Sequence, residues 1–159
     1  MEEGYIPRAN FLVMVANEEI PLTGSQFADH NLQMLIAYTR DEDLSNRDWA
    51  TMLLAQQAID TPEIRDALVA ATNDEDACVR GEALQGLAER DTGVALPILL
   101  RELEQDDCAY ATFQAARIVA NPALLKGLRR WMGRGDAPWI NDEITDAITA
   151  SEGNQSPDS

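Results

Sequence analysis

Residues that commonly build small chemical sites are scarce in this sequence. Its 159 residues include two cysteines, Cys78 and Cys108, and one histidine, His30. Two cysteines are too few for a disulfide scaffold, and with a single histidine they give no set of zinc ligands with a recognisable spacing. We therefore expect both thiols to be reduced and used in packing, and we expect no metal and no other cofactor.

Aromatic residues and long apolar runs are also few. The chain has three Phe, three Tyr and three Trp, while Ala and Leu supply much of its 45% hydrophobic content. That composition favours helices over sheets. No apolar run approaches the roughly 20 residues that a membrane-spanning helix needs, and the first residues carry acid where a signal peptide carries positive charge. We expect a soluble, cytoplasmic protein.

Basic residues are greatly outnumbered by acidic ones. There are 28 Asp and Glu against 12 Lys and Arg, a formal net charge of −16. Such a field repels nucleic acid and anionic membranes and attracts a basic protein. The same charge can also serve solubility alone. It therefore restricts the class of partner without establishing that there is one.

The sequence motifs of the common enzyme classes are missing as well. There is no glycine-rich phosphate loop, no HExxH pair and no Cys-His or Ser-His-Asp arrangement. Adjacent acids such as Asp106 and Asp107 occur, but chance produces such pairs in so acidic a chain. We expect a protein without enzymatic activity.

What the sequence does contain is an internal repeat. Residues 40–50 align with residues 73–83 at a constant offset of 33, and a third, weaker copy follows at about 32. Each unit has an apolar helical segment, an acidic turn and a second helical segment. Thr61 and Pro62 are typical of a helix start, and Asn121 and Pro122 repeat that signal.

The repeated pattern is Asp-x-x-x-x-Val-Arg-x-x-Ala-x-x-x-Leu. It stands in the second unit as Asp74, Val79, Arg80, Ala83 and Leu87. This pattern resembles HEAT repeats and the HEAT-like repeats of phycobilin lyases. The resemblance implies an all-α fold, a short right-handed α-solenoid of about four helical hairpins. It also implies a structural ladder across the turns, made by Asp41, Arg47, Asp74 and Arg80.

The resemblance divides the chain into three parts. Residues 1–28 are predicted to cap the stack, with the apolar run 11–16 forming either a helix or an extended strand. Residues 29–150 are predicted to form the repeats, and residues 151–159 a disordered tail. The predicted units are 29–60, 61–91, 92–121 and 122–150.

Function in such a solenoid is expected on the concave face, which the second helix of each hairpin forms. The repeat register makes Ala50, Ala83 and Ala115 core residues and turns their neighbours towards solvent. The predicted partner-binding residues are Trp49, Met52, Gln56, Glu82, Gln85, Glu89, Gln114 and Arg117. Trp49 and Met52 lead this set, because Trp is a frequent interface anchor. The alternative, in which Trp49 packs beneath the N-terminal segment, stays open.

One short segment has the opposite charge to the rest. Lys126, Arg129, Arg130 and Arg134 surround Trp131. Basic residues around an aromatic ring can bind phosphate or RNA, but they more often complement the C-terminal end of a helix. They can also pair with an acidic patch on a second copy.

These observations predict a non-catalytic module whose acidic concave face binds a basic protein. The hypothesis has two versions, a scaffold or assembly factor and an immunity protein that blocks a basic toxin. The alternative is a HEAT-like lyase or chaperone-lyase acting on a tetrapyrrole-like ligand, which fold analogy alone suggests. We expect no nucleic acid or membrane partner, and a monomer or weak homo-oligomer.

Overall fold

The computed structural model describes residues 6–132, 134 and 138–153, and every regular element in these ranges is helical. None of the described helices has both the length and the apolar character needed to cross a bilayer. A short 3₁₀ turn, η1, covers Pro122–Leu124. The α-helices are α1 (Asn10–Ala16), α2 (Gln26–Tyr38), α3 (Leu44–Ala55), α4 (Pro62–Ala71), α5 (Ala77–Arg90), α6 (Thr92–Glu102), α7 (Tyr110–Val119), α8 (Leu125–Trp131) and α9 (Pro138–Gly153).

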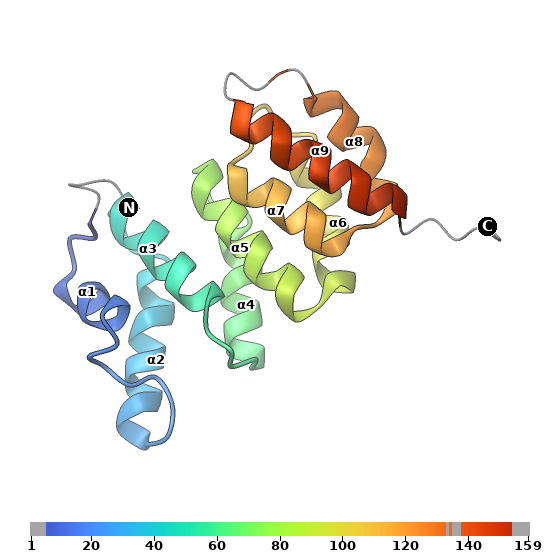
Figure 1. The fold of residues 1–159 in the computed structure, drawn as a ribbon. Coiled ribbons are helices and arrows are strands. Elements are labelled where there is room, and N and C mark those ends of the chain that lie inside the picture. Colours follow the sequence, from blue (N-terminus) through green and yellow to red (C-terminus); the bar gives the residue numbers. More distant parts are fainter. Residues whose placement is uncertain (1–5, 133, 135–137, 154–159) are drawn as a thin grey trace.

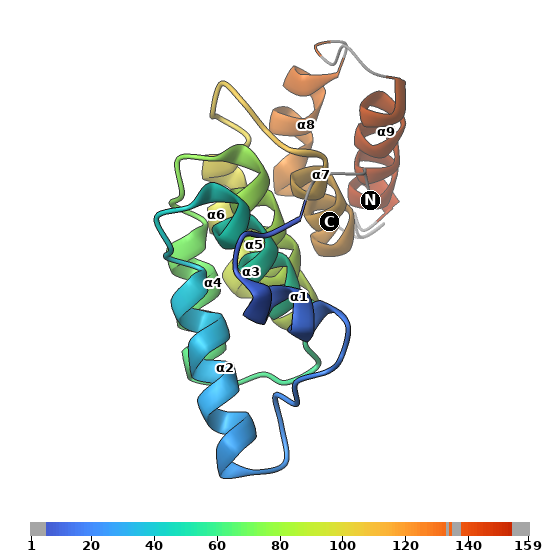
Figure 2. The same ribbon diagram turned by 90° about the vertical axis from the view of Figure 1, so that its left-hand side faces the viewer.

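From α2 onwards the helices form two layers (Figure 1). Helices α3, α5, α7 and α9 pack side by side in an inner layer, and α2, α4, α6 and α8 each pack on the helix that follows. Turning the molecule shows α2, α4 and α6 following one another along the outer side (Figure 2). The predicted fold class, a short all-α solenoid of helical hairpins, is confirmed.

Polar side chains start the helices where the sequence predicts. The Thr61 hydroxyl accepts a hydrogen bond from the amide of Ile64 at 3.3 Å, with Pro62 in the first turn of α4. Asp43 and Asp76, the last residues of the two acidic turns, accept amide hydrogen bonds at the starts of α3 and α5. These contacts satisfy amides that have no partner inside the helix.

The core is made mainly of Leu and Ala, which lets the helices approach closely. Helices α3 and α5 approach closely at Gly86, where an added Cβ would lie 2.7 Å from the Cβ of Ala55. Real Cβ atoms do not come so close, so this crossing requires glycine. This close crossing brings side chains of α3 and side chains of α5 within reach of one another.

The N-terminal segment covers one end of the stack as a helix. Helix α1 packs against α3, and the amide of Ala9 donates to Oδ1 of Asn46 at 2.9 Å. Arg8 forms an ion pair with Asp43 at 3.1 Å. Of the two forms predicted for this segment, the structure has the helix.

Two predictions need correction. Helix α9 continues to Gly153 and buries Ser151 completely, so residues 151–153 do not belong to a disordered tail; residues 154–159 lie outside the described ranges. Cys78 is exposed and not packed, whereas Cys108 is half-buried with its thiol donating to the carbonyl of Glu102 at 3.3 Å. Burial raises the pKa of the Cys108 thiol to about 12, which keeps it protonated.

Candidate functional site

The clearest candidate site is a hollow of about 80 Å³ between α3 and α5. Five of the eight predicted partner-binding residues line it, together with Ala55 and Gly86. These five are Met52, Gln56, Glu82, Gln85 and Glu89. They lie three, four and seven residues apart on adjacent helices, a spacing that places them on one face. The repeat register therefore identified residues that the fold does bring together.

A pair of carboxyl groups stands at the edge of this hollow. Glu82 lies partly buried on α5 and is hydrogen-bonded to Asp48 on α3, which is only 8% exposed. Burial, followed by the contact with Asp48, holds the pKa of Glu82 well above its ordinary range. Two carboxylates so close in a poorly hydrated place repel each other, so the pair retains a proton near neutral pH. A cationic group entering the hollow would favour the charged form of Glu82.

Trp49 does not line the hollow, and its predicted exposure is wrong. Its side chain is 7% exposed and belongs to the hydrophobic core. Helix α1 packs on α3, and Leu12 and Val15 of α1 belong to the same hydrophobic core as Trp49. Trp49 is therefore a core residue and not an exposed anchor.

Gln114 and Arg117 lie on α7, apart from the hollow. Gln114 is half-buried, and Nε of Arg117 lies 3.3 Å from Oε1 of Glu143 on α9. The hydroxyl of Tyr110 donates to Oε2 of the same carboxylate at 3.1 Å. The buried Glu143 therefore joins α7 to α9, and the Arg117 side chain, 47% exposed, adds a positive charge to an otherwise acidic face.

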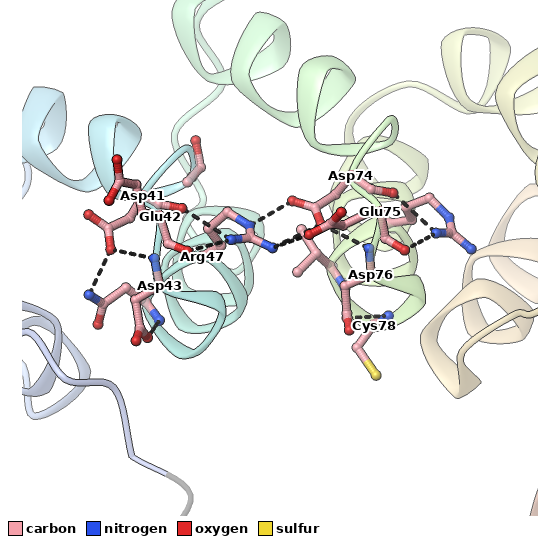
Figure 3. A network of polar contacts seen from close by, with 12 residues as sticks. Asp41, Glu42, Asp43, Arg47, Asp74, Glu75, Asp76 and Cys78 are labelled. Carbon is pink, nitrogen blue, oxygen red and sulfur yellow. Dashed lines mark hydrogen bonds and ion pairs between the residues drawn. The ribbon is translucent and has the colours of Figure 1, made fainter.

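Asp41 and Asp74 lie in the turns inside two successive hairpins, and Arg47 lies in α3 between them (Figure 3). Arg80 takes the equivalent position in α5. Nε of Arg47 donates to Oδ2 of Asp74 at 3.0 Å. The same guanidinium donates to the carbonyls of Asp41 and Glu42 at 3.2 and 3.1 Å. One arginine thereby closes its own turn and holds the turn of the next unit.

Arg80 repeats this arrangement one unit further along. It donates to both carboxylate oxygens of Glu102 at 3.0 and 3.1 Å and to Oδ1 of Asp107 at 2.7 Å. It also donates to the carbonyls of Asp74 and Glu75. Burial raises the pKa of Glu102, and Arg80 opposes that rise. Glu102 and Asp107 were not predicted, because the third unit no longer matches the repeat motif.

Arg90 is a further residue that the motif did not identify. Its side chain, 6% exposed, lies at the end of α3 and donates to four backbone carbonyls there. The acceptors are Leu54, Ala55, Gln57 and Ile59, at 3.3, 3.0, 2.6 and 3.0 Å. Leu54 and Ala55 are the last two residues of α3, and Gln57 and Ile59 follow the helix, so Arg90 on α5 caps the C-terminal end of α3. In the sequence, Arg90 is recognisable only as a basic residue in the last turn of α5. Such a residue is expected to cap its own helix, α5, and not α3.

Comparison with known proteins agrees with the helical repeats. The family model for HEAT repeats matches residues 32–120, more than half of the chain. The chain belongs to the HEAT-repeat family. The ladder arginines Arg47 and Arg80 both lie inside the matched range. HEAT repeats commonly mediate protein interactions.

A solved structure supports the same fold. The chain is similar to the X-ray structure of YibA of E. coli, with a TM-score of 0.59 and 24% sequence identity. The similarity covers 88% of this chain and 54% of that one, so the HEAT-repeat chain corresponds to about half of the larger protein. No curated protein matches the sequence.

Proposed function

We propose that this HEAT-repeat protein is a non-catalytic interaction module whose inner face, the exposed side of α3, α5 and α7, binds a basic protein partner. The observation that carries the proposal is the hollow between α3 and α5. Its lining combines the apolar Met52 with amide and carboxyl groups, among them Glu82 and Glu89. A lysine or arginine side chain can place its methylenes against Met52 and its charge against the carboxyl groups.

The size of the hollow favours a protein side chain over a small-molecule ligand. At about 80 Å³ it is well below the roughly 300–1,000 Å³ of pockets that enclose drug-sized ligands. A tetrapyrrole-like ligand would need a much larger cavity on this face. The lyase alternative therefore gains no support from the inner face.

Charge supports a basic partner in two ways. The formal net charge of −16 attracts a basic protein from a distance, and Glu82 and Glu89 provide acidic groups where the partner would dock. We propose that the partner is met in the cytoplasm, and that the module acts either as a scaffold or assembly factor or as an immunity protein that covers the basic cleft of a toxin. The two versions differ in the partner and share the binding face.

Affinity capture tests the proposal. The tagged protein is incubated with extract of its native cell at low and at moderate salt, and retained proteins are identified by mass spectrometry. We expect one basic protein, bound stoichiometrically and released by salt. Its identity would distinguish a toxin from an assembly client. Recovery of a coloured small ligand, or of an acidic protein, would contradict the proposal.

A matched pair of variants then locates the binding face. Glu82→Gln with Glu89→Gln removes two acids from the hollow, whereas Glu63→Gln with Asp66→Asn removes two exposed acids from α4 in the outer layer. Because Glu82 holds a proton in the free protein, the α4 variant removes at least as much charge as the inner-face variant, so a larger loss from the inner-face variant cannot come from net charge. We expect the first to weaken binding of the captured partner at least about tenfold, or about 1.4 kcal/mol, and the second to change it little. Equal losses would mean that the inner face is not the binding face.

A further inference from the structure

A second and larger groove lies on the outer layer, between α6 and the η1–α8 segment. Its volume is about 590 Å³. Leu100 contributes exposed apolar surface to it, with the buried Leu103 beneath, and we call these two residues the leucine floor. Three cationic side chains, Lys126, Arg129 and Arg130, also line it, and we call them the basic rim.

The basic rim is a local concentration of positive charge in a strongly acidic chain. Three of the 12 basic residues of a chain with 28 acidic ones line this single groove. Acidic groups are few here: Glu104 is the acid in the groove lining, and Glu152 forms an exposed ion pair with Arg129 at 3.3 Å. An exposed pair of this kind contributes little and can exchange partners. Lys126 is exposed in the first turn of α8, just after η1.

The groove is held in shape by contacts at the end of α6. The indole Nε1 of Trp131 donates to the carbonyl of Leu103 at 2.7 Å, and Arg130 donates to the same carbonyl. The ring of Trp131 packs edge-on against Phe113 in the core, with centroids 6.0 Å apart. Arg130 lies over the indole ring, 5.4 Å from its centroid. Leu103 and Arg130 are therefore held in place before a ligand binds, which lowers the entropy cost of binding at these two residues.

We propose that this groove binds a short acidic segment of a protein, with an aliphatic side chain on the leucine floor and carboxylates on the basic rim. The leucine floor calls for an apolar group, which a phosphate or sugar-phosphate backbone does not offer. A long polyanion such as RNA would extend beyond the basic rim and be repelled by the rest of the chain, whose net charge is −16. A short acidic segment stays within about 8–10 Å of the rim, where salt screens the repulsion from more distant acids. Two copies of so acidic a chain repel each other, which disfavours a second copy as the occupant.

Fluorescence anisotropy with two synthetic probes tests this inference. One labelled peptide carries Leu and Glu at alternating helical positions, and the other has Lys in place of each Glu. At low salt we expect the acidic probe to bind in the micromolar range and at least about tenfold more tightly than the basic probe. Failure of the acidic probe to bind at millimolar protein concentration, or preference for the basic probe, would overturn the inference.

Variants of the full chain connect that binding to the groove. Lys126→Glu with Arg129→Glu reverses the rim, and Ala123→Trp fills the groove without changing charge, since the exposed Ala123 is part of its lining. We expect each to weaken the acidic probe at least about tenfold. The control, Arg8→Glu with Arg40→Glu, makes the same charge change at exposed positions elsewhere in the chain. Circular dichroism and thermal melting check that every variant folds.

Three results would count against the groove. If the control weakens the acidic probe as much as the rim variant does, the attraction is long-range and not local. If Ala123→Trp leaves binding unchanged, the probe does not occupy the groove. If sedimentation shows a wild-type dimer that the rim variant dissociates, the occupant is a second copy and the proposed acidic partner is wrong.

Discussion

At the scale of single residues, the carboxyl pair on α3 and α5 makes stability depend on pH. The pKa of Glu82 is raised from an ordinary value of 4.5 by burial and by Asp48, so the folded chain holds a proton that the unfolded chain releases above that pH. Stability contributed by this group therefore falls as pH rises above about 4.5. Glu82→Gln removes the ionisation and keeps an amide that can hydrogen-bond to Asp48. We expect it to increase the free energy of unfolding at pH 8 by about 1–2 kcal/mol and to change it little at pH 4.5, since one pKa unit corresponds to about 1.4 kcal/mol.

Urea unfolding at both pH values measures this difference. Other acids act in the opposite direction: hydrogen bonds and ion pairs lower the pKa of Asp43, Asp60 and Asp91, and the stability they contribute is lost on acidification. They are common to wild type and variant, so they cancel in the comparison at each pH. The exposed Glu89→Gln serves as the control. A gain at pH 4.5 equal to that at pH 8 would show that Glu82 does not hold a proton in the folded state.

Trp49 and Met52 provide a second test at this scale. Trp49 is 7% exposed, so Trp49→Ala should create a cavity and lower the free energy of unfolding by about 3–5 kcal/mol. Met52 lines the hollow and is half-buried, so Met52→Ala should cost about 1 kcal/mol or less and weaken partner binding instead. Urea unfolding and affinity for the captured partner measure the two effects. Unchanged stability in Trp49→Ala would restore Trp49 as an exposed contact.

At the scale of secondary-structure elements, Arg90 joins α5 to the end of α3. Arg90→Ala would leave the carbonyls of Leu54, Ala55, Gln57 and Ile59 without this donor. Because unsatisfied buried acceptors are costly, we expect a loss of about 2–4 kcal/mol in the free energy of unfolding. Lysine keeps the charge but lacks the planar set of donors, so Arg90→Lys should recover only part of the loss. Thermal and urea unfolding measure both variants, and full recovery with lysine would mean that charge alone explains the role of Arg90.

Element by element, the sequence was informative where the repeat is regular. The offset between residues 40–50 and 73–83 located the two acidic turns, and the resemblance to HEAT repeats gave the ladder arginines their roles, because turn and ladder are local and recur in each unit. It could not show that Trp49 is buried or that α1 packs on α3, since α1 lies outside the repeat. The sequence also could not identify the groups to which Arg90 and Arg80 donate hydrogen bonds. Glu102, Asp107 and the end of α3 come near these arginines only after the hairpins have stacked.

At the scale of the whole molecule, the charge is unevenly distributed. The inner face carries acids at the α3–α5 hollow, and the outer face carries the basic rim between α6 and α8. A net charge of −16 sets the long-range field, but it does not decide which face a partner approaches, because the field of distant charges is screened beyond about 8–10 Å in physiological salt. Encounter with a basic partner should therefore depend on both the total charge and the local acids.

Association kinetics separate these two contributions. We expect the association rate with the captured basic partner to fall steeply as salt rises, while the dissociation rate changes much less, because steering acts before the contact forms. At low salt Glu89→Gln should slow association more than Glu63→Gln, because Glu89 lies at the hollow and Glu63 lies on α4, although each variant removes one exposed charge. Stopped-flow mixing at several salt concentrations measures this. Equal slowing by the two variants would mean that net charge alone steers the partner, and an association rate independent of salt would mean that the acidity serves solubility and not recognition.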